Sequence, residues 1–274
     1  MSVLVAEARK VPAFLRRDLL TLLSYRAAFV GDLLAIAVPA VMFGFFAKLV
    51  EPSALPTYNG VATGYFEFVM IGVIIATVSG LLLAKVSTAI RQEQLMGTLE
   101  ALLVTPTSPT TVQIGSAAFD LLFVPVRMAV LLLVVSLTAG LDFAASGIVP
   151  SLVILMCFVP FVWGLGLLAA AAIVTFRRGG GVIGVGMSVL GLASGAFFPL
   201  ALLPRWIQTL SEANPMAITM EGTRDALIGG SGWRGLGGVL VVLVPLSVAA
   251  LGAGVVAFRA ALTREHRNGT LGLY

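Results

Sequence analysis

Long apolar stretches alternate with short polar ones along the whole chain. A helix needs about 20 consecutive apolar residues to cross the hydrocarbon core of a bilayer, and runs of roughly that length recur from residue 27 to residue 258. Clusters of proline, glycine or charged residues separate the runs, as is typical of segments at the membrane surface. The pattern predicts six membrane-spanning helices, at about residues 27–49, 64–86, 112–141, 148–176, 182–203 and 236–258.

The segment before the first span has the periodicity of an amphipathic helix. Pro12 suits a first helical position, and leucines follow on one face of the helix at Leu15, Leu19, Leu22 and Leu23. This pattern predicts a helix from Val11 to Tyr25 that lies in the membrane surface. The alternative is a helix that simply continues into the first span.

Two further segments outside the spans have helical features. Residues 87–106 form a conspicuously polar segment between the second and third spans. In residues 204–233, Asn214-Pro215 is typical of an N-cap followed by a first-turn proline, and Gly229-Gly230 is a stop. This predicts a short, partly apolar helix rather than a seventh span. We expect one all-α integral membrane domain over residues 1–274, with non-spanning parts at 1–26, 87–106, 204–233 and 259–274.

The composition excludes a water-soluble fold. Hydrophobic residues make up 59% of the chain and charged residues 11%, with a mean hydropathy of +1.05, whereas soluble domains have roughly 25% charged residues. The net charge of +4 does not indicate a nucleic-acid partner, because the basic residues lie between spans rather than on a basic face interleaved with aromatics.

The positive-inside rule explains the basic residues and predicts the orientation. With both termini in the cytoplasm, four basic residues lie outside, namely Lys48, Arg205, Arg224 and Arg234, and Arg127 lies in the membrane. The inner side then holds Arg9, Lys10, Arg16, Arg17, Arg26, Lys85, Arg91, Arg177, Arg178, Arg259, Arg264 and Arg267. The polar segment 87–106 is therefore expected to be cytoplasmic and the segment 204–233 to face outward.

The chain lacks the residues that several kinds of functional site require. No lysine precedes a serine or threonine, so the chain has no phosphate-binding loop of the Gly-Lys-Ser/Thr type. His266 is the only histidine and lies in the tail, which excludes a histidine-based zinc site or general base in the membrane. Cys157 is the only cysteine, so no intramolecular disulfide forms. We expect no catalytic residue, metal or cofactor in this chain.

Three motifs, taken in order along the chain, resemble those of type-2 ATP-binding-cassette (ABC) exporter permeases. The first is Gly97-Thr98-Leu99-Glu100, followed by Leu102-Leu103 and Thr105-Pro106. The second runs from Ser194-Gly195-Ala196-Phe197-Phe198-Pro199 through Leu203-Pro204-Arg205-Trp206 to Asn214-Pro215. The third is the tail Asn268-Gly269-Thr270-Leu271. Together they extend the resemblance over essentially the whole chain.

The resemblance implies six spans, a second permease copy (identical or a paralogue) and two cytoplasmic ATPase subunits that bind ATP and magnesium. It also implies that the helix from Arg91 to Leu103 is the coupling helix, which sits in a groove of the ATPase. The implied coupling residues are Arg91, Glu93, Gly97, Thr98, Leu99, Glu100, Leu103, Thr105 and Pro106. An amphipathic helix here offers leucines for burial and charges for pairing. The alternative is an ordinary solvated loop helix.

Two groups within the spans are candidates for the substrate path or gate. Arg127 lies near the middle of the third span, where an ionised side chain is costly unless it is paired or hydrated, and Glu67 in the second span is a candidate partner. The pair lines the path or is a structural link between helices. The resemblance implies that Phe197 and Phe198 form an apolar gate at the dimer axis. The alternative is that the two rings pack against the protein core or the lipid.

These features lead us to expect the membrane subunit of an ATP-driven exporter in a bacterial cytoplasmic membrane. The resemblance implies a hydrophobic small molecule such as a drug or natural product, a lipid or a lipid-linked glycan as substrate. Two alternatives stay open. A self-contained ion-coupled carrier or channel would use Asp32, Glu67, Asp120 and Arg127. A structural or assembly factor of the membrane would work without the segment 87–106.

Overall fold

The computed structural model describes residues 11–24, 42–49, 55–95, 143–176 and 180–268, with residue 31 and helical pieces between 122 and 136. Apart from one isolated bridge between Tyr58 and Val61, regular structure in these residues is helical. In chain order the elements are α2 (Val11–Ser24), α4 (Tyr65–Leu95), α7 (Ala145–Phe176), α8 (Gly180–Leu192), η2 (Leu200–Leu202), α9 (Arg205–Glu212), α10 (Pro215–Leu227) and α11 (Leu236–Asn268). The predicted all-α class is confirmed for this part of the chain.

Three of the described helices, α4, α7 and α11, are long and apolar enough to cross a membrane. At 1.5 Å per residue the 31-residue α4 is about 46 Å long, well beyond a hydrocarbon core of about 30 Å. These three helices fall on the second, fourth and sixth predicted spans. Of the third predicted span the structure describes only helical pieces between 122 and 136, and the first falls mostly outside the described residues.

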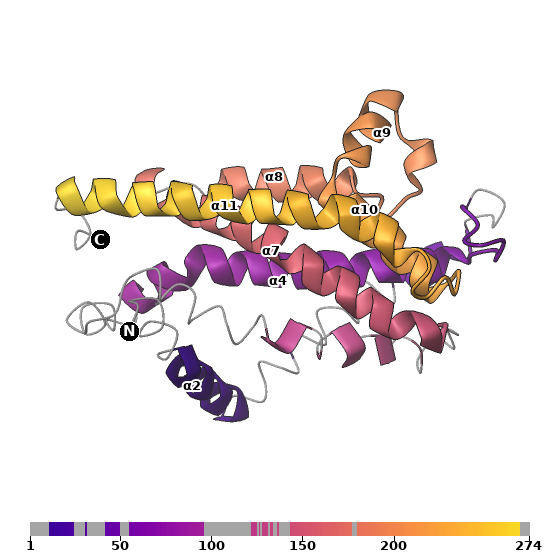
Figure 1. Ribbon diagram of the computed structural model, residues 1–274, viewed down its shortest axis with the longest axis horizontal. Helices are drawn as coiled ribbons and strands as arrows, with labels where there is room; N and C mark the ends of the chain where they lie inside the picture. Colours follow the sequence, from indigo (N-terminus) through magenta and orange to yellow (C-terminus); the bar gives the residue numbers. More distant parts are fainter. Residues whose placement is uncertain are drawn as a thin grey trace.

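The three long helices run in the same direction (Figure 1). All three begin beside α10: Arg224 of α10 binds the first turn of α4, Gly147 of α7 packs against Ala226, and Val239 of α11 packs against Gly222. Further along, Gly166 of α7 lies against Val86 of α4. Because the three helices run in the same direction, the chain has to return to the starting side once between α4 and α7 and once between α7 and α11. This agrees with the prediction that the third and fifth spans run in the opposite direction.

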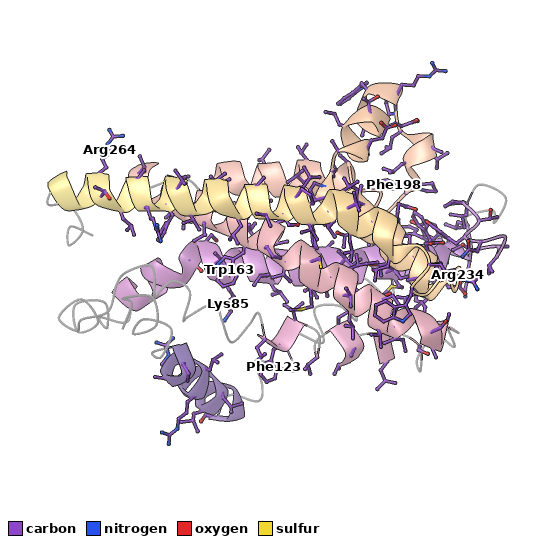
Figure 2. The ribbon with its side chains drawn as sticks, in the orientation of Figure 1. Lys85, Phe123, Trp163, Phe198, Arg234 and Arg264 are labelled. Atoms are coloured by element: carbon purple, nitrogen blue, oxygen red, sulfur yellow. The ribbon has the colours of Figure 1, made fainter. Side chains whose placement is uncertain are left out.

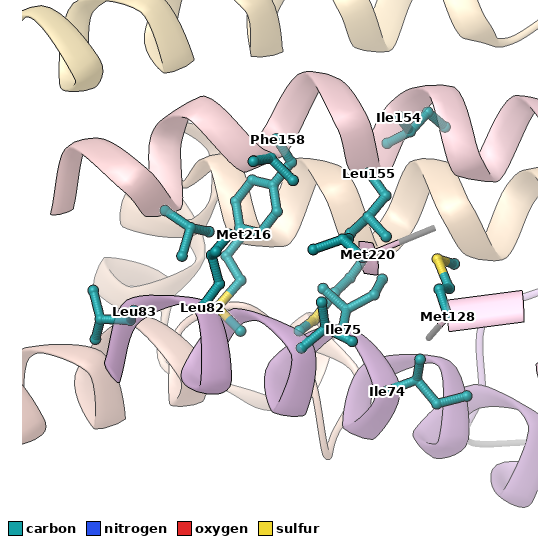
Figure 3. Close-up of a cluster of buried hydrophobic side chains, with 14 of the residues drawn as sticks. Ile74, Ile75, Leu82, Leu83, Met128, Ile154, Leu155, Phe158, Met216 and Met220 are labelled. Atoms are coloured by element: carbon teal, nitrogen blue, oxygen red, sulfur yellow. The ribbon is translucent and has the colours of Figure 1, made fainter. Parts of the chain in front are cut away.

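The core lies between α4, α7 and α10 (Figure 3). Isoleucine and leucine side chains of α4 meet Leu155 and Phe158 of α7, while Met216 and Met220 of α10 fill the space between them. The three candidate spans are buried to very different degrees, with 67% of the most apolar stretch of α4 inside the molecule but only 17% of that of α11. The lower burial of α11 leaves a row of valines exposed: Val241, Val242, Val244, Val248 and Val256. α4 is therefore the most deeply buried of the three candidate spans, while α7 packs against α4, α10 and α11.

Helix ends differ from the prediction at three places. α4 continues to Leu95 rather than ending at Val86, because residues 87–95 contain good helix formers and no proline or glycine. α11 continues to Asn268, ten residues beyond the predicted end, for the same reason. α8 instead ends at Leu192 rather than 203, because Gly195 has a φ of +69° that breaks the helix.

The segment 204–233 contains two helices rather than one, with α9 preceding the predicted helix α10. The N-cap prediction is confirmed, since the Asn214 side chain accepts a hydrogen bond from the Met216 backbone N–H at 3.0 Å. Asn214 also donates to the Leu190 carbonyl, and Ser211 donates to the Ala193 carbonyl, so both helices are fastened to the end of α8. A helix at the predicted N-terminal position is confirmed as α2, while its role as an amphipathic helix in the membrane surface stays a prediction.

Candidate functional site

The predicted coupling segment begins as the last turns of α4. Arg91 and Glu93 belong to this helix, whose end at Leu95 marks the limit of the described residues in this region. The other predicted coupling residues lie outside the described part of the chain: Gly97, Thr98, Leu99, Glu100, Leu103, Thr105 and Pro106. The coupling role stays a prediction, but the start of the segment is continuous with α4, the most deeply buried of the candidate spans.

The two predicted gate residues lie at the other end of α4, in the turn formed by residues 193–198, which we call the 193–198 turn (Figure 2). The Phe197 ring stacks on Phe43 with 5.5 Å between ring centroids and lies 6.2 Å from the Phe198 ring. Phe43 is buried, Phe197 half-buried and Phe198 43% exposed. Phe197 and Phe198 thus belong to an aromatic cluster whose buried member, Phe43, is not singled out from the sequence, and their role as a gate stays a prediction.

Two contacts fasten the 193–198 turn to α4. The Tyr65 hydroxyl donates a hydrogen bond to the Phe197 carbonyl at 3.1 Å. About two turns later, the Ala196 carbonyl approaches Gly72 so closely that a Cβ atom at residue 72 would overlap it. The position of the two phenylalanines therefore depends on the position of this end of α4.

The most unusual residue of this region is Arg224 of α10, whose side chain is completely buried. Its Nε donates to the Phe68 carbonyl of α4 at 3.1 Å, and its Nη2 donates to the carbonyls of Gly195 at 2.9 Å and Ala196 at 3.3 Å. The guanidinium carbon also lies 3.5 Å from the centroid of the Phe68 ring, in a cation–π contact. One side chain thus joins α10, α4 and the 193–198 turn.

Glu221 supplies the negative charge beside this arginine. Its carboxylate accepts from Arg224 Nη1 at 2.8 Å and from the Tyr58 hydroxyl at 2.7 Å. The neighbouring Asn59 donates to the Gly229 carbonyl at 3.0 Å, so the loop before α4 is attached both to α10 and to the turn that follows it. We call Arg224, Glu221, Tyr58 and Phe68, with the carbonyls of Gly195 and Ala196, the Arg224 cluster.

The Arg224 cluster is suited to holding backbone in place rather than to catalysis. Three of its acceptors are main-chain carbonyls, and the planar fork of an arginine can satisfy several such acceptors at once in a fixed geometry. Within the part of the chain that the structure describes, no group of histidine, cysteine or acidic side chains could hold a metal ion. The site can therefore position the turn that bears Phe197 and Phe198.

The pKa of the Tyr58 hydroxyl is raised well above its usual value of 10.0, first by burial and then by the Glu221 carboxylate. Below pH 10 both the folded and the unfolded tyrosine are protonated, and the hydrogen bond stabilises the fold in full. Above pH 10 the unfolded tyrosine ionises while the folded one does not, so stability falls as the pH rises, by up to about 1.4 kcal/mol per pH unit.

We therefore expect Tyr58→Phe to lower stability by about 1 kcal/mol at pH 8, with the difference from the wild type shrinking between pH 10 and 11. Thermal unfolding of the detergent-purified protein, followed by tryptophan fluorescence at several pH values, measures both effects. A constant difference across this range would contradict the role assigned to the Tyr58 hydroxyl.

Glu67 has a local partner at the start of α4. Its carboxylate accepts from the Gly64 backbone N–H at 3.3 Å, the reverse bond of a capping box, in which a side chain of the first turn binds the N-cap residue. Arg127 lies outside the described residues, so its predicted pairing with Glu67 stays a prediction.

The Arg224 cluster is not predicted from the sequence. Arg224 is expected there only as an outward-facing charge, although Glu221 and Arg224 have the i, i+3 spacing of a helical ion pair. That spacing predicts the pair but not its burial, because Phe68 and Gly195 reach Arg224 from segments that are 156 and 29 residues away in the chain.

Comparison of the sequence with models of known protein families shows which family the chain belongs to. A family model for the ABC-2 type transporter matches residues 10–228, which is most of the chain and includes α2, α4, α7, α8, α9 and α10. The chain belongs to the ABC-2 type transporter family. It is thus a permease, the membrane-embedded component of an ABC transporter, and its long apolar helices agree with that assignment. No curated protein matches the sequence significantly.

Proposed function

We propose that this ABC-2 permease is the membrane subunit of an ATP-driven exporter in a bacterial cytoplasmic membrane. Two permease copies work with two cytoplasmic ATPase subunits, which bind ATP and magnesium. Closure of the ATPase pair moves the coupling segments and shifts the permease between inward-open and outward-open states. The substrate is a hydrophobic small molecule, a lipid or a lipid-linked glycan that leaves the cytoplasm.

One observation carries this proposal beyond the family assignment. α4 is a single helix that begins at the aromatic cluster of Phe197 and ends in the predicted coupling segment, with Arg91 and Glu93 in its last turns. α4 has no internal proline and stays helical through its Ser79-Gly80 pair, so we expect it to carry a displacement along its length. A displacement of the coupling segment by an ATPase is therefore felt at the 193–198 turn, about 46 Å away along α4.

The distribution of charge supports the orientation in this proposal. Arg264, near the end of α11, and Arg234, just before its start, lie at opposite ends of the bundle (Figure 2). The basic residues at 259, 264 and 267 lie near the same end as Arg91, which the positive-inside rule assigns to the cytoplasm. The 193–198 turn, α9 and α10 then lie at the external side.

We expect Glu100→Lys to abolish association with the ATPase or its stimulation, because the substitution reverses a charge that the family resemblance assigns to the ATPase groove. The tagged permease is purified from mild detergent, the co-purifying proteins are identified, and ATPase activity is measured in the eluate. Arg234→Glu is the matched control, since it reverses an exposed charge at the opposite end of the bundle.

A wild-type permease that purifies without any ATPase subunit would contradict the exporter proposal and favour an ion-coupled carrier. An intact complex with full ATPase stimulation in Glu100→Lys would instead remove Glu100 from the coupling role.

A further inference from the structure

Arg224 lies where the 193–198 turn, the first turns of α4 and α10 meet. Most buried arginines neutralise a carboxylate, but here only one of four hydrogen bonds goes to Glu221, and three go to main-chain carbonyls. A side chain that binds carbonyls from two other segments fixes their relative position. It does so by geometry rather than by charge alone.

The Glu221 charge is accessible to water, whereas the arginine is not. The Glu221 side chain is 40% exposed and the Arg224 side chain is 0% exposed. Water can therefore replace the arginine as a partner for the carboxylate, but it cannot easily reach the carbonyls of Phe68, Gly195 and Ala196 at the buried centre. The interaction that Arg224 supplies, and that water cannot replace, is a buried hydrogen-bonded link between α4 and the 193–198 turn, in addition to the Tyr65 hydrogen bond and the close approach of Ala196 to Gly72.

We propose that Arg224 is a positioning residue that makes the 193–198 turn, with Phe197 and Phe198, move together with α4 when nucleotide drives the transport cycle. The inference rests on the proposed function, because the movement starts at a partner ATPase. Tyr65 acts in the same direction through its bond to the Phe197 carbonyl, with a smaller effect. Loss of these bonds leaves α4 free to move while the turn no longer follows.

The test uses single spin labels at two positions in the complex with the ATPase subunit, after Cys157→Ala removes the only native cysteine. One label replaces Thr88, near the coupling end of α4. The other replaces Leu202, which is 66% exposed and whose backbone N–H is bonded to the Pro199 carbonyl just after the turn. Single labels avoid ambiguity from several permease copies, and the probe is ATP with vanadate.

In the wild-type background we expect ATP and vanadate to change the spectra of both labels. In Arg224→Lys the label at residue 88 should still respond, while the response of the label at residue 202 should be lost. Lysine keeps the charge beside Glu221, but it cannot satisfy carbonyls on two segments with the arginine's planar fork. Tyr65→Phe should reduce the response at residue 202 partly. Arg234→Lys, at an exposed arginine near the same end, should leave both responses unchanged.

The outcomes separate this inference from the proposed function. A wild-type complex in which the label at residue 88 is silent contradicts the exporter mechanism itself. If, in the wild-type background, the label at residue 88 responds and the label at residue 202 does not, the turn does not follow α4. This result overturns the role of Arg224. Full responses in Arg224→Lys also overturn it. If Arg224→Lys does not assemble, Arg224→Gln serves in its place, because its amide keeps fewer donors than the guanidinium, and a full response at residue 202 in that variant overturns the proposal.

Discussion

Arg224→Leu should destabilise the protein by about 3–5 kcal/mol, because it removes one partner from a buried polar network and leaves the others unsatisfied. Leucine approximates the apolar part of the arginine stem but offers no donor. The carbonyls of Phe68, Gly195 and Ala196 would each lose a donor in a place that water reaches poorly. The cation–π contact with the Phe68 ring is lost as well.

The loss of stability is expected to differ between variants of Arg224 and variants of Glu221. Glu221 is partly exposed and can exchange its arginine partner for water, so Glu221→Gln should be much milder, at about 1 kcal/mol. Glutamine keeps one oxygen to accept from Arg224, and its amide N–H can donate to the Tyr58 oxygen where the second carboxylate oxygen accepted before. Thermal unfolding in detergent, with monodispersity in size-exclusion chromatography, measures both variants.

Arg234→Leu is the matched control, since it makes the same change at an exposed arginine and should alter stability by less than about 0.5 kcal/mol. A Glu221→Gln variant as unstable as Arg224→Leu would contradict the argument, because it would assign the energy to the ion pair. Similar stability of Arg224→Leu and the wild type would show that the carbonyls find other donors.

The sequence predicts the long helices well because a bilayer imposes a length and a composition on each span. Hydropathy alone predicts α7 and α11 to within three residues at their starts. Local capping chemistry is equally readable, as Asn214-Pro215 at the start of α10 demonstrates. Span length and composition follow from the thickness of the bilayer, and helix capping follows from residues that are adjacent in the chain. Both can therefore be predicted from the sequence.

The sequence does not predict features that depend on segments meeting in space. The end of α8 at Leu192 is missed because apolar residues continue to Leu203, and hydropathy cannot distinguish a span from a turn that other elements cover. The Arg224 cluster is missed for a related reason. A charge in an external segment is expected to face water, and only the tertiary arrangement of α4, α10 and the 193–198 turn provides the buried carbonyls that bind it.

The remaining large effect is expected where α7 crosses α11. Between apolar helices in a bilayer, close contact of small residues supplies much of the association energy, because lipid competes with apolar side chains on equal terms. Gly164 of α7 lies directly against the backbone of α11. A Cβ atom at residue 164 would overlap the Ala250 carbonyl, and one at Gly254 would overlap the Gly164 carbonyl. Each glycine therefore permits an approach that a larger residue forbids.

Gly164→Leu should force the two helices apart and destabilise the protein by about 3 kcal/mol or more, which is at or above the usual range for overpacking because backbone cannot yield as a side chain does. Thermal unfolding in detergent measures the loss. Gly252→Leu is the matched control, because the same change is made on α11 at a position with open space around it, and leucine favours a helix over glycine by up to about 1 kcal/mol.

The double variant Gly164→Leu with Gly254→Leu tests whether the two glycines serve one contact. Once the first leucine has separated α7 from α11, the second meets little further resistance, so the combined loss should be clearly smaller than the sum of the two single losses. Strict additivity would mean that the two positions act through different neighbours. A stable Gly164→Leu protein would mean that α11, whose apolar stretch is only 17% buried, can shift without disturbing the central packing of α4, α7 and α10.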